Sequence, residues 1–240
     1  MRIFFCFAII FSLVSLFDVA SAQVDNILKG VKLPAKEGSS DSTTVASGLK
    51  EALTIGTGNA VTSVSKADGY FGNKIIKILL PEKIQTIANA LGKLGYQKQV
   101  DDFVLSMNRA AEKAAPQAKE IFIDAIKEMS FEDAKKILNG GNTSATDYFK
   151  AKTSNKIFEA FKPIVSSSMN EVGTTKAYNE MMGKYTSSVP FAKKESLDLN
   201  TYVTNKATDG LFYMVGQEEK KIRTDPSARV TDLLKTVFSK

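Results

Sequence analysis

Residues 199–223 read LNTYVTNKATDGLFYMVGQEEKKIR, and this stretch indicates the fold of the chain. Its apolar residues recur at the spacing of one helix face, at Leu199, Val203, Ala207, Leu211, Met214, Val215 and Ile222. An apolar stripe of this kind has to be covered by other elements. The pattern therefore predicts a long helix packed within a helical bundle.

Helical patterning extends from this stretch over most of the chain. It predicts further helices at residues 45–64, 82–94, 98–115, 117–129, 131–138, 145–172, 174–185 and 228–238. Ser130 and Asp133 form a capping-box pattern, Pro116 suits a first helical turn, and Pro163 should kink or divide its helix. We therefore expect an all-α fold: a single bundle of about eight to ten short helices over residues 45–240.

One segment departs from the helical pattern. Residues 68–81 read DGYFGNKIIKILLP, in which Gly69 and Gly72 indicate a turn and a short apolar run follows. The run is short enough to be either an extended strap or one buried turn. We interpret residues 68–81 as a short extended arm laid across the bundle.

The N-terminal segment predicts export. Arg2 precedes an apolar run at residues 3–17, and small residues lead up to Ala22 as in a signal-peptidase site. The run is shorter than the roughly 20 residues that a membrane-spanning helix needs. We expect residues 1–22 to be a signal peptide cleaved after Ala22, and residues 23–44 to be a flexible tether with few large apolar groups. The mature chain is then expected to have no transmembrane segment.

The composition restricts the chemistry of the mature chain. The sequence contains no histidine, and its one cysteine, Cys6, lies inside the predicted signal peptide. A mature chain without these residues cannot have a Ser-His or Cys-His nucleophile, a disulfide, or a zinc site built from histidine or thiolate. We predict no metal and no cofactor.

The charge of the chain limits its partners. The formal net charge is +6, but the lysines are spread over many predicted helices and are not gathered in one arm. Export together with this scatter argues against nucleic acid as a partner. Anionic lipid or polyanionic envelope surfaces stay open, beside the simpler interpretation of a solvated lysine-rich surface.

A carboxylate lies on the apolar face of the long predicted helix. At about 100° per residue, Glu218 falls near the centre of the apolar stripe. A charge facing a core must be paired or hydrogen-bonded. We predict a polar cluster inside the bundle, formed by Asn108, Arg109, Glu112, Tyr202, Lys206 and Glu218.

Several short motifs resemble those of a known family. They are DGYFGN at 68–73, MNRAAE at 107–112, ATDYF at 145–149, YVT at 202–204 and GLF at 210–212. Their order resembles that of the exported bacterial family catalogued as domain of unknown function 4197, over about residues 45–238. The resemblance implies an envelope protein of Gram-negative-type bacteria, located in the periplasm, and it implies no activity, substrate or catalytic residue.

Two interpretations of the predicted cluster stay open, a network that fixes helix register or the polar end of a ligand pocket. We expect a non-catalytic binding or scaffold module, whose partner is an envelope protein or a small apolar ligand. The alternative is an enzyme that acts on an envelope lipid or polymer. It would use Glu218 as acid or base, with Lys206 or Arg109 stabilising an anion.

Overall fold

A computed structural model of the protein describes residues 40–171, 173–189, 191, 198–229, 231 and 235. The predicted signal peptide, its cleavage site after Ala22, most of the predicted tether and most of the helix expected at 228–238 lie outside these residues. The first described helix begins at Ser40, earlier than the expected start at Val45.

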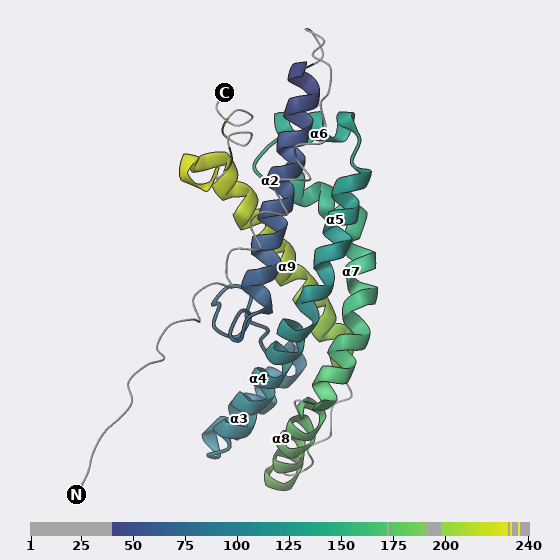
Figure 1. Cartoon of the computed structure of the whole chain (residues 1–240). Coiled ribbons are helices and arrows are strands. Elements are labelled where there is room, and N and C mark those ends of the chain that lie inside the picture. Colours follow the sequence, from purple (N-terminus) through teal and green to yellow (C-terminus); the bar gives the residue numbers. More distant parts are fainter. Residues whose placement is uncertain are drawn as a thin grey trace, which may run out of the picture. The chain divides into compact units, whose positions relative to one another are not determined.

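Helices make up most of the described chain (Figure 1). The α-helices are α2 (Ser40–Ser65), α3 (Glu82–Lys93), α4 (Gln97–Ala114), α5 (Ala118–Glu128), α6 (Phe131–Asn139), α7 (Ser144–Glu171), α8 (Thr174–Ser188) and α9 (Leu199–Thr224). Two short 3-10 helices, η1 (Ala115–Gln117) and η2 (Pro226–Ala228), follow α4 and α9. The described part of the chain contains no strand, which confirms the all-α class.

The expectation of eight to ten short helices is slightly off, because much of the described chain lies in a few long helices. Helices α2 and α9 have 26 residues each, and α7 has 28. Pro163 does not divide α7, which continues through it. Pro163 and Glu159 are both exposed, so water can solvate the carbonyl that loses its helical donor.

Two local predictions about helix boundaries are confirmed. Ser130 caps α6, and its side chain and that of Asp133 each accept from the other's backbone N–H. Pro116 lies in the first turn of η1, between α4 and α5, a position at which the missing N–H of proline is tolerated.

The core is built around α7, which packs against α4, α5 and α9. Phe122 of α5 joins three of these helices, because its ring lies 5.2 Å from Phe149 of α7 and 6.0 Å from Phe212 of α9. Phe103 of α4 contacts Tyr178 of α8 at 5.5 Å between ring centroids. These edge-to-face and tilted contacts are the arrangements that aromatic rings prefer, and they hold the long helices together.

The arm lies between α4 and α9, as the hydrogen bonds described below show. Residues 67–72 and 74–76 lie in turns, and residues 77–81 contain no helix or turn. Tyr70, Ile76 and Ile78 point into the core. Gly210 of α9 permits this approach, because a Cβ there would lie 2.7 Å from the Tyr70 ring and 3.1 Å from Ile76.

Membrane-spanning helices are not found among the described residues, since none of their helices combines the required length with the required hydropathy.

Candidate functional site

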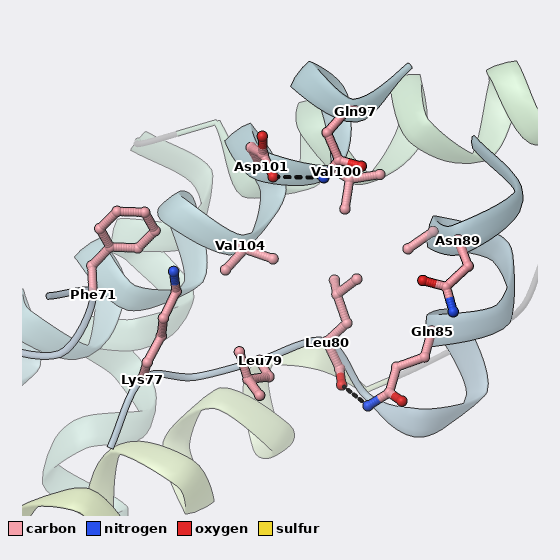
Figure 2. Close-up of a pocket in the computed structure, with 11 residues that line it drawn as sticks. Phe71, Lys77, Leu79, Leu80, Gln85, Asn89, Gln97, Val100, Asp101 and Val104 are labelled. Atoms are coloured by element: carbon pink, nitrogen blue, oxygen red, sulfur yellow. Dashed lines mark hydrogen bonds between the residues drawn. The ribbon is translucent and has the colours of Figure 1, made fainter. Parts of the chain in front are cut away.

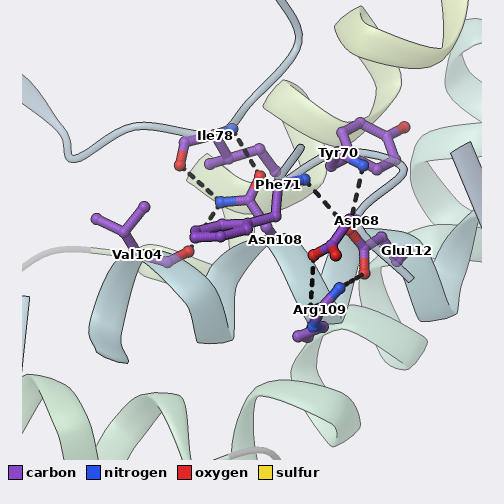
Figure 3. Close-up of polar contacts among 8 residues, drawn as sticks. All are labelled: Asp68, Tyr70, Phe71, Ile78, Val104, Asn108, Arg109 and Glu112. Carbon is purple, nitrogen blue, oxygen red and sulfur yellow. Dashed lines mark hydrogen bonds and ion pairs between the residues drawn. The ribbon is translucent and has the colours of Figure 1, made fainter. Parts of the chain in front are cut away.

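Asn108 holds the arm against α4 in the way a neighbouring strand would. Its side-chain nitrogen donates to the Ile78 carbonyl at 2.9 Å, and its oxygen accepts from the Ile78 N–H at 2.8 Å (Figure 3). The same nitrogen donates to the Val104 carbonyl at 2.8 Å. Asn108 is fully buried, so these bonds satisfy polar groups that water does not reach.

Glu112, one turn further along α4, holds the beginning of the arm. Its Oε1 accepts from the backbone N–H groups of Tyr70 at 3.1 Å and Phe71 at 3.2 Å. Its Oε2 accepts from Arg109 at 2.7 Å, and Arg109 also donates to Asp68 at 2.8 Å. The hydrogen bond to Glu112 raises the pKa of Arg109, so the guanidinium stays charged. The buried carboxylate is thereby compensated by this cation and by two amides.

Two tyrosines, one in the arm and one in α9, link the arm to α9. The Tyr70 hydroxyl donates to the Ala207 carbonyl at 2.6 Å, and the Tyr202 hydroxyl donates to the Leu79 carbonyl at 2.9 Å. Burial, helped by the charge of Glu112, raises the pKa of Tyr70 well above its ordinary value. Tyr70 is therefore a neutral donor at every physiological pH. We call Asn108, Arg109, Glu112 and Asp68 the arm clasp.

A second buried carboxylate lies toward the C-terminal end of α9. Glu219 accepts from the N–H groups of Ala145 and Thr146, both at 2.9 Å, and from the Thr146 hydroxyl at 2.8 Å. These amides belong to the first turn of α7, where intrahelical acceptors are lacking and negative charge is favoured. Glu219 therefore caps α7 from another helix.

Arg223 completes this arrangement one turn after Glu219. Its Nε donates to the Glu219 carboxylate at 3.0 Å, and its Nη2 donates to the Ile137 carbonyl at 2.7 Å. Ile137 lies in the last turn of α6, where carbonyls lack intrahelical donors and positive charge is favoured. We call Ile137, Ala145, Thr146, Glu219 and Arg223 the α6–α7 corner.

The structure divides the predicted polar cluster. It brings Asn108, Arg109 and Glu112 together on α4. Tyr202 reaches the same arm from α9. Lys206 is exposed and lies 6.0 Å from the centroid of the Tyr202 ring, so it does not join the buried groups.

Glu218 lies outside the arm clasp, which differs from the prediction. Its carboxylate pairs with Lys221 at 2.5 Å and accepts from Asn59 of α2 at 3.3 Å. Neither Arg109 nor Lys206 is among these partners, so the geometry gives no support to an enzyme that uses Glu218 with them.

The sequence pattern missed Glu219 by one residue because the buried face of α9 turns along the helix. Near the arm the buried residues include Val203, Ala207 and Leu211, and toward the α6–α7 corner they are Phe212, Val215, Glu219 and Ile222. The prediction assumed one straight apolar stripe along the whole helix, whose direction lies between these two faces and passes through Glu218. The spacing of three, four and three residues in the second set is the signal that could have indicated Glu219.

The arm also forms one wall of a groove of about 580 Å³, bounded by α3 and α4 (Figure 2). Figure 2 shows Leu80, Val100 and Val104 around its centre. We call this space the arm groove. Its apolar lining consists of Phe71, Leu79, Leu80, Ala88, Val100 and Val104, and its polar lining of Lys77, Gln85, Asn89, Gln97 and Asp101.

Three polar residues of the arm groove, Gln97, Gln85 and Lys77, contact other groups of the protein. Gln97 donates to Asp101 at 2.8 Å, and Gln85 donates to the Leu80 carbonyl at 3.2 Å. The Lys77 ammonium lies 3.9 Å from the centroid of the Phe71 ring, a cation–π contact that holds the charge at one end of the groove.

Comparison with known proteins assigns the chain to a family. The family model described as "Protein of unknown function (DUF4197)" matches residues 39–239, and the chain belongs to this family. No curated protein and no solved structure matches the chain. This match confirms the family that the sequence motifs indicated.

Proposed function

We propose that this protein is an exported, non-catalytic binding module of the bacterial envelope, cleaved after Ala22 and located in the periplasm, which holds a small amphipathic anion in the arm groove. The single observation that carries the proposal is the arm groove itself, an apolar space with a lysine fixed at one end. Its volume of about 580 Å³ lies within the range typical of small-molecule sites.

The buried carboxylates support a binding role over a catalytic one. Glu112 and Glu219 each accept several hydrogen bonds from the protein's own backbone and from an arginine. Both are therefore used in holding segments together. General acid or base work would require a carboxylate that is free to reach a substrate, and these two are engaged by the protein itself.

The lining of the arm groove indicates the class of ligand. Val100, Val104 and Leu80 offer apolar contact to an alkyl or aromatic body. Lys77 offers a positive charge to a carboxylate, sulfate or phosphate head. Asp101 also lines the groove, and one of its carboxylate oxygens accepts a hydrogen bond from Gln97. A medium-chain fatty acid has this combination of an apolar body and an anionic end, and it serves as the probe below.

The first test measures whether the groove binds such a probe. Protein purified from a periplasm is examined by native mass spectrometry and titrated with dodecanoate by calorimetry. Val104→Glu places a charge in the groove and should weaken dodecanoate binding at least about tenfold. The matched control is Leu94→Glu, because Leu94 is 49% exposed and does not line the groove.

A second pair of measurements tests the role of Lys77. Lys77→Gln should weaken dodecanoate binding about tenfold, because it removes the cation that faces the carboxylate. The same substitution should leave binding of the neutral alcohol dodecanol within about twofold. Equal binding of dodecanoate by wild-type protein, Val104→Glu and Leu94→Glu would refute the groove as the site, and an empty wild-type protein that binds neither probe would refute the ligand class.

A further inference from the structure

The arm also exposes large apolar side chains in a second depression, which lies between the arm and α9 and shares Leu79 with the arm groove. Ile75 is 66% exposed and Leu79 58%, and both line this shallow depression of about 740 Å³ with Tyr213 of α9, which is 36% exposed. Leaving such side chains in water is unfavourable. We call Ile75, Leu79, Tyr213, Lys83 and Lys206 the outer arm surface.

This exposure is built into the fold. Along the arm, Ile76 and Ile78 are buried whereas Ile75 and Leu79 point outward. Asn108 fixes the Ile78 backbone on one side, and Tyr202 fixes the Leu79 carbonyl on the other. The arm is therefore held in a conformation in which Ile75 and Leu79 face outward, and these two side chains add little to the core.

Lysines surround these apolar groups. Lys83 and Lys206 line the same depression, and Lys74 is exposed beside Ile75, whereas the ammonium of Lys77 lies over the Phe71 ring in the arm groove. The acidic residues in the lining are Glu82 and Asp209, so three lysines stand against two carboxylates. The Lys206 ammonium lies 6.0 Å from the Tyr202 ring, and Tyr202 and Tyr213 add the amphipathic rings that favour a membrane–water boundary.

We propose that the outer arm surface docks the protein on an anionic phospholipid bilayer. Apolar side chains ringed by lysines and tyrosines match the headgroup region, which offers negative charge at its surface and apolar chains below. The protein's net charge of +6 adds to the attraction. This inference goes beyond the proposed function, because it depends on Ile75, Lys206 and Tyr213, which do not line the arm groove, and because the partner is a lipid bilayer.

The test is vesicle binding of the ligand-free full mature chain. Vesicles of phosphatidylcholine containing phosphatidylglycerol are compared with vesicles of phosphatidylcholine alone, by flotation and by surface plasmon resonance. We expect binding to the anionic vesicles only, and weaker binding in high salt, because salt screens charges beyond a distance of about 10 Å at 0.1 M.

Two matched pairs of variants locate the surface. Ile75→Asp should weaken binding to the anionic vesicles about tenfold, whereas Leu94→Asp, at an exposed apolar site on another surface, should not change it. Lys206→Glu should weaken binding at least about fivefold, whereas Lys135→Glu on α6 should change it less than twofold. All four sites are exposed, so circular dichroism should show the wild-type fold.

The two proposals can fail separately. Val104→Glu should bind vesicles like the wild type, and Ile75→Asp should bind dodecanoate like the wild type, since Ile75 does not line the arm groove. Failure of the wild-type protein to bind phosphatidylglycerol vesicles would overturn the bilayer proposal whatever the result with dodecanoate. Equal affinity of Ile75→Asp, Lys206→Glu and the two controls would overturn the assignment of the surface.

Discussion

In both the arm clasp and the α6–α7 corner, a buried glutamate accepts hydrogen bonds from two consecutive backbone N–H groups and pairs with an arginine about one turn away. At the corner, the amides begin α7, and the arginine reaches the end of α6. At the clasp, the amides belong to an arm that has no helical hydrogen-bond ladder of its own. The same pair of residues therefore stabilises helix ends in one place and fixes an irregular segment in the other.

The two regions should therefore differ in how their loss affects stability and binding. The residues of the α6–α7 corner do not line the arm groove or the depression at the outer arm surface, so their loss should lower the free energy of unfolding without a separate effect on binding. The clasp positions Lys77, which lines the arm groove, and Leu79, which lines the arm groove and belongs to the outer arm surface. Its loss should affect binding more than its cost in stability suggests.

The largest expected effect is that of Glu219→Ala. It removes the cap of α7 and leaves Arg223, whose side chain is 12% exposed, without its carboxylate. Breaking a buried pair in this way costs about 3–5 kcal/mol in the free energy of unfolding. Urea denaturation followed by circular dichroism measures the loss.

The neighbouring residue is the matched control for this prediction. The Glu218 side chain is 13% exposed, but its partner Lys221 is 60% exposed and stays hydrated when the carboxylate is removed, so Glu218→Ala should cost no more than about 1 kcal/mol. Similar losses for the two variants would contradict the assignment of the buried carboxylate to Glu219.

Glu112→Ala should have a smaller effect on stability, about 2–3 kcal/mol, because two arm amides lose their acceptor. Arg109 is 32% exposed and keeps Asp68, so its charge stays hydrated and paired. We expect hydrogen exchange at Tyr70 and Phe71 to accelerate strongly and dodecanoate binding to fall. Glu219→Ala should retain dodecanoate binding when the binding is measured at a temperature below the unfolding midpoint of this variant. A loss of binding equal to that of Glu112→Ala would show that the two regions do not have separate roles.

How far the sequence predicts this molecule depends on the range of the interactions. The capping box of Ser130 and Asp133 and the turn glycines before the arm are local signals, and each was recognisable within a few residues. The helical class follows from stripes within single segments. The partner of a buried carboxylate depends on which helix crosses which, as Glu219 and Ala145 show, since 74 residues separate them.

The arm illustrates the same limit. Its glycines and apolar run predict a non-helical segment, but no pattern within residues 68–81 shows that Asn108 binds Ile78 or that Tyr70 reaches Ala207. The arm groove and the depression at the outer arm surface both follow from these long-range contacts. Helix periodicity within single segments could therefore not predict them.

Glycines on α9 give a smaller and more local comparison. A Cβ at Gly210 would lie 2.7 Å from the Tyr70 ring, so Gly210→Ala should push the arm outward and cost about 1–3 kcal/mol. At Gly216, near the corner, the nearest atom would be the Thr146 hydroxyl at 3.5 Å, an ordinary contact. Gly216→Ala should therefore be neutral or stabilising by up to about 1 kcal/mol, from helix propensity.

Thermal and urea unfolding of the two alanine variants measure this difference. Dodecanoate binding adds a second readout, because only Gly210→Ala should disturb the arm groove. A stabilised Gly210→Ala variant would show that the arm is not held closely against α9.

Among the substitutions that should weaken the attachment of the arm, Tyr70→Phe should have the smallest effect at neutral pH: it removes the hydrogen bond to Ala207 and should cost about 0.5–1.5 kcal/mol. Its pH dependence is more informative. Burial raises the pKa of Tyr70 in the folded protein, whereas the unfolded chain has the ordinary value of about 10. Below that pH the hydroxyl is protonated in both states, and its full contribution is present. Above it only the unfolded state releases the proton, so the free energy of unfolding falls as pH rises. Tyr70→Phe should therefore show a shallower decline above about pH 10 than the wild type in urea titrations, and parallel curves would mean that the Tyr70 hydroxyl reaches solvent in the folded protein.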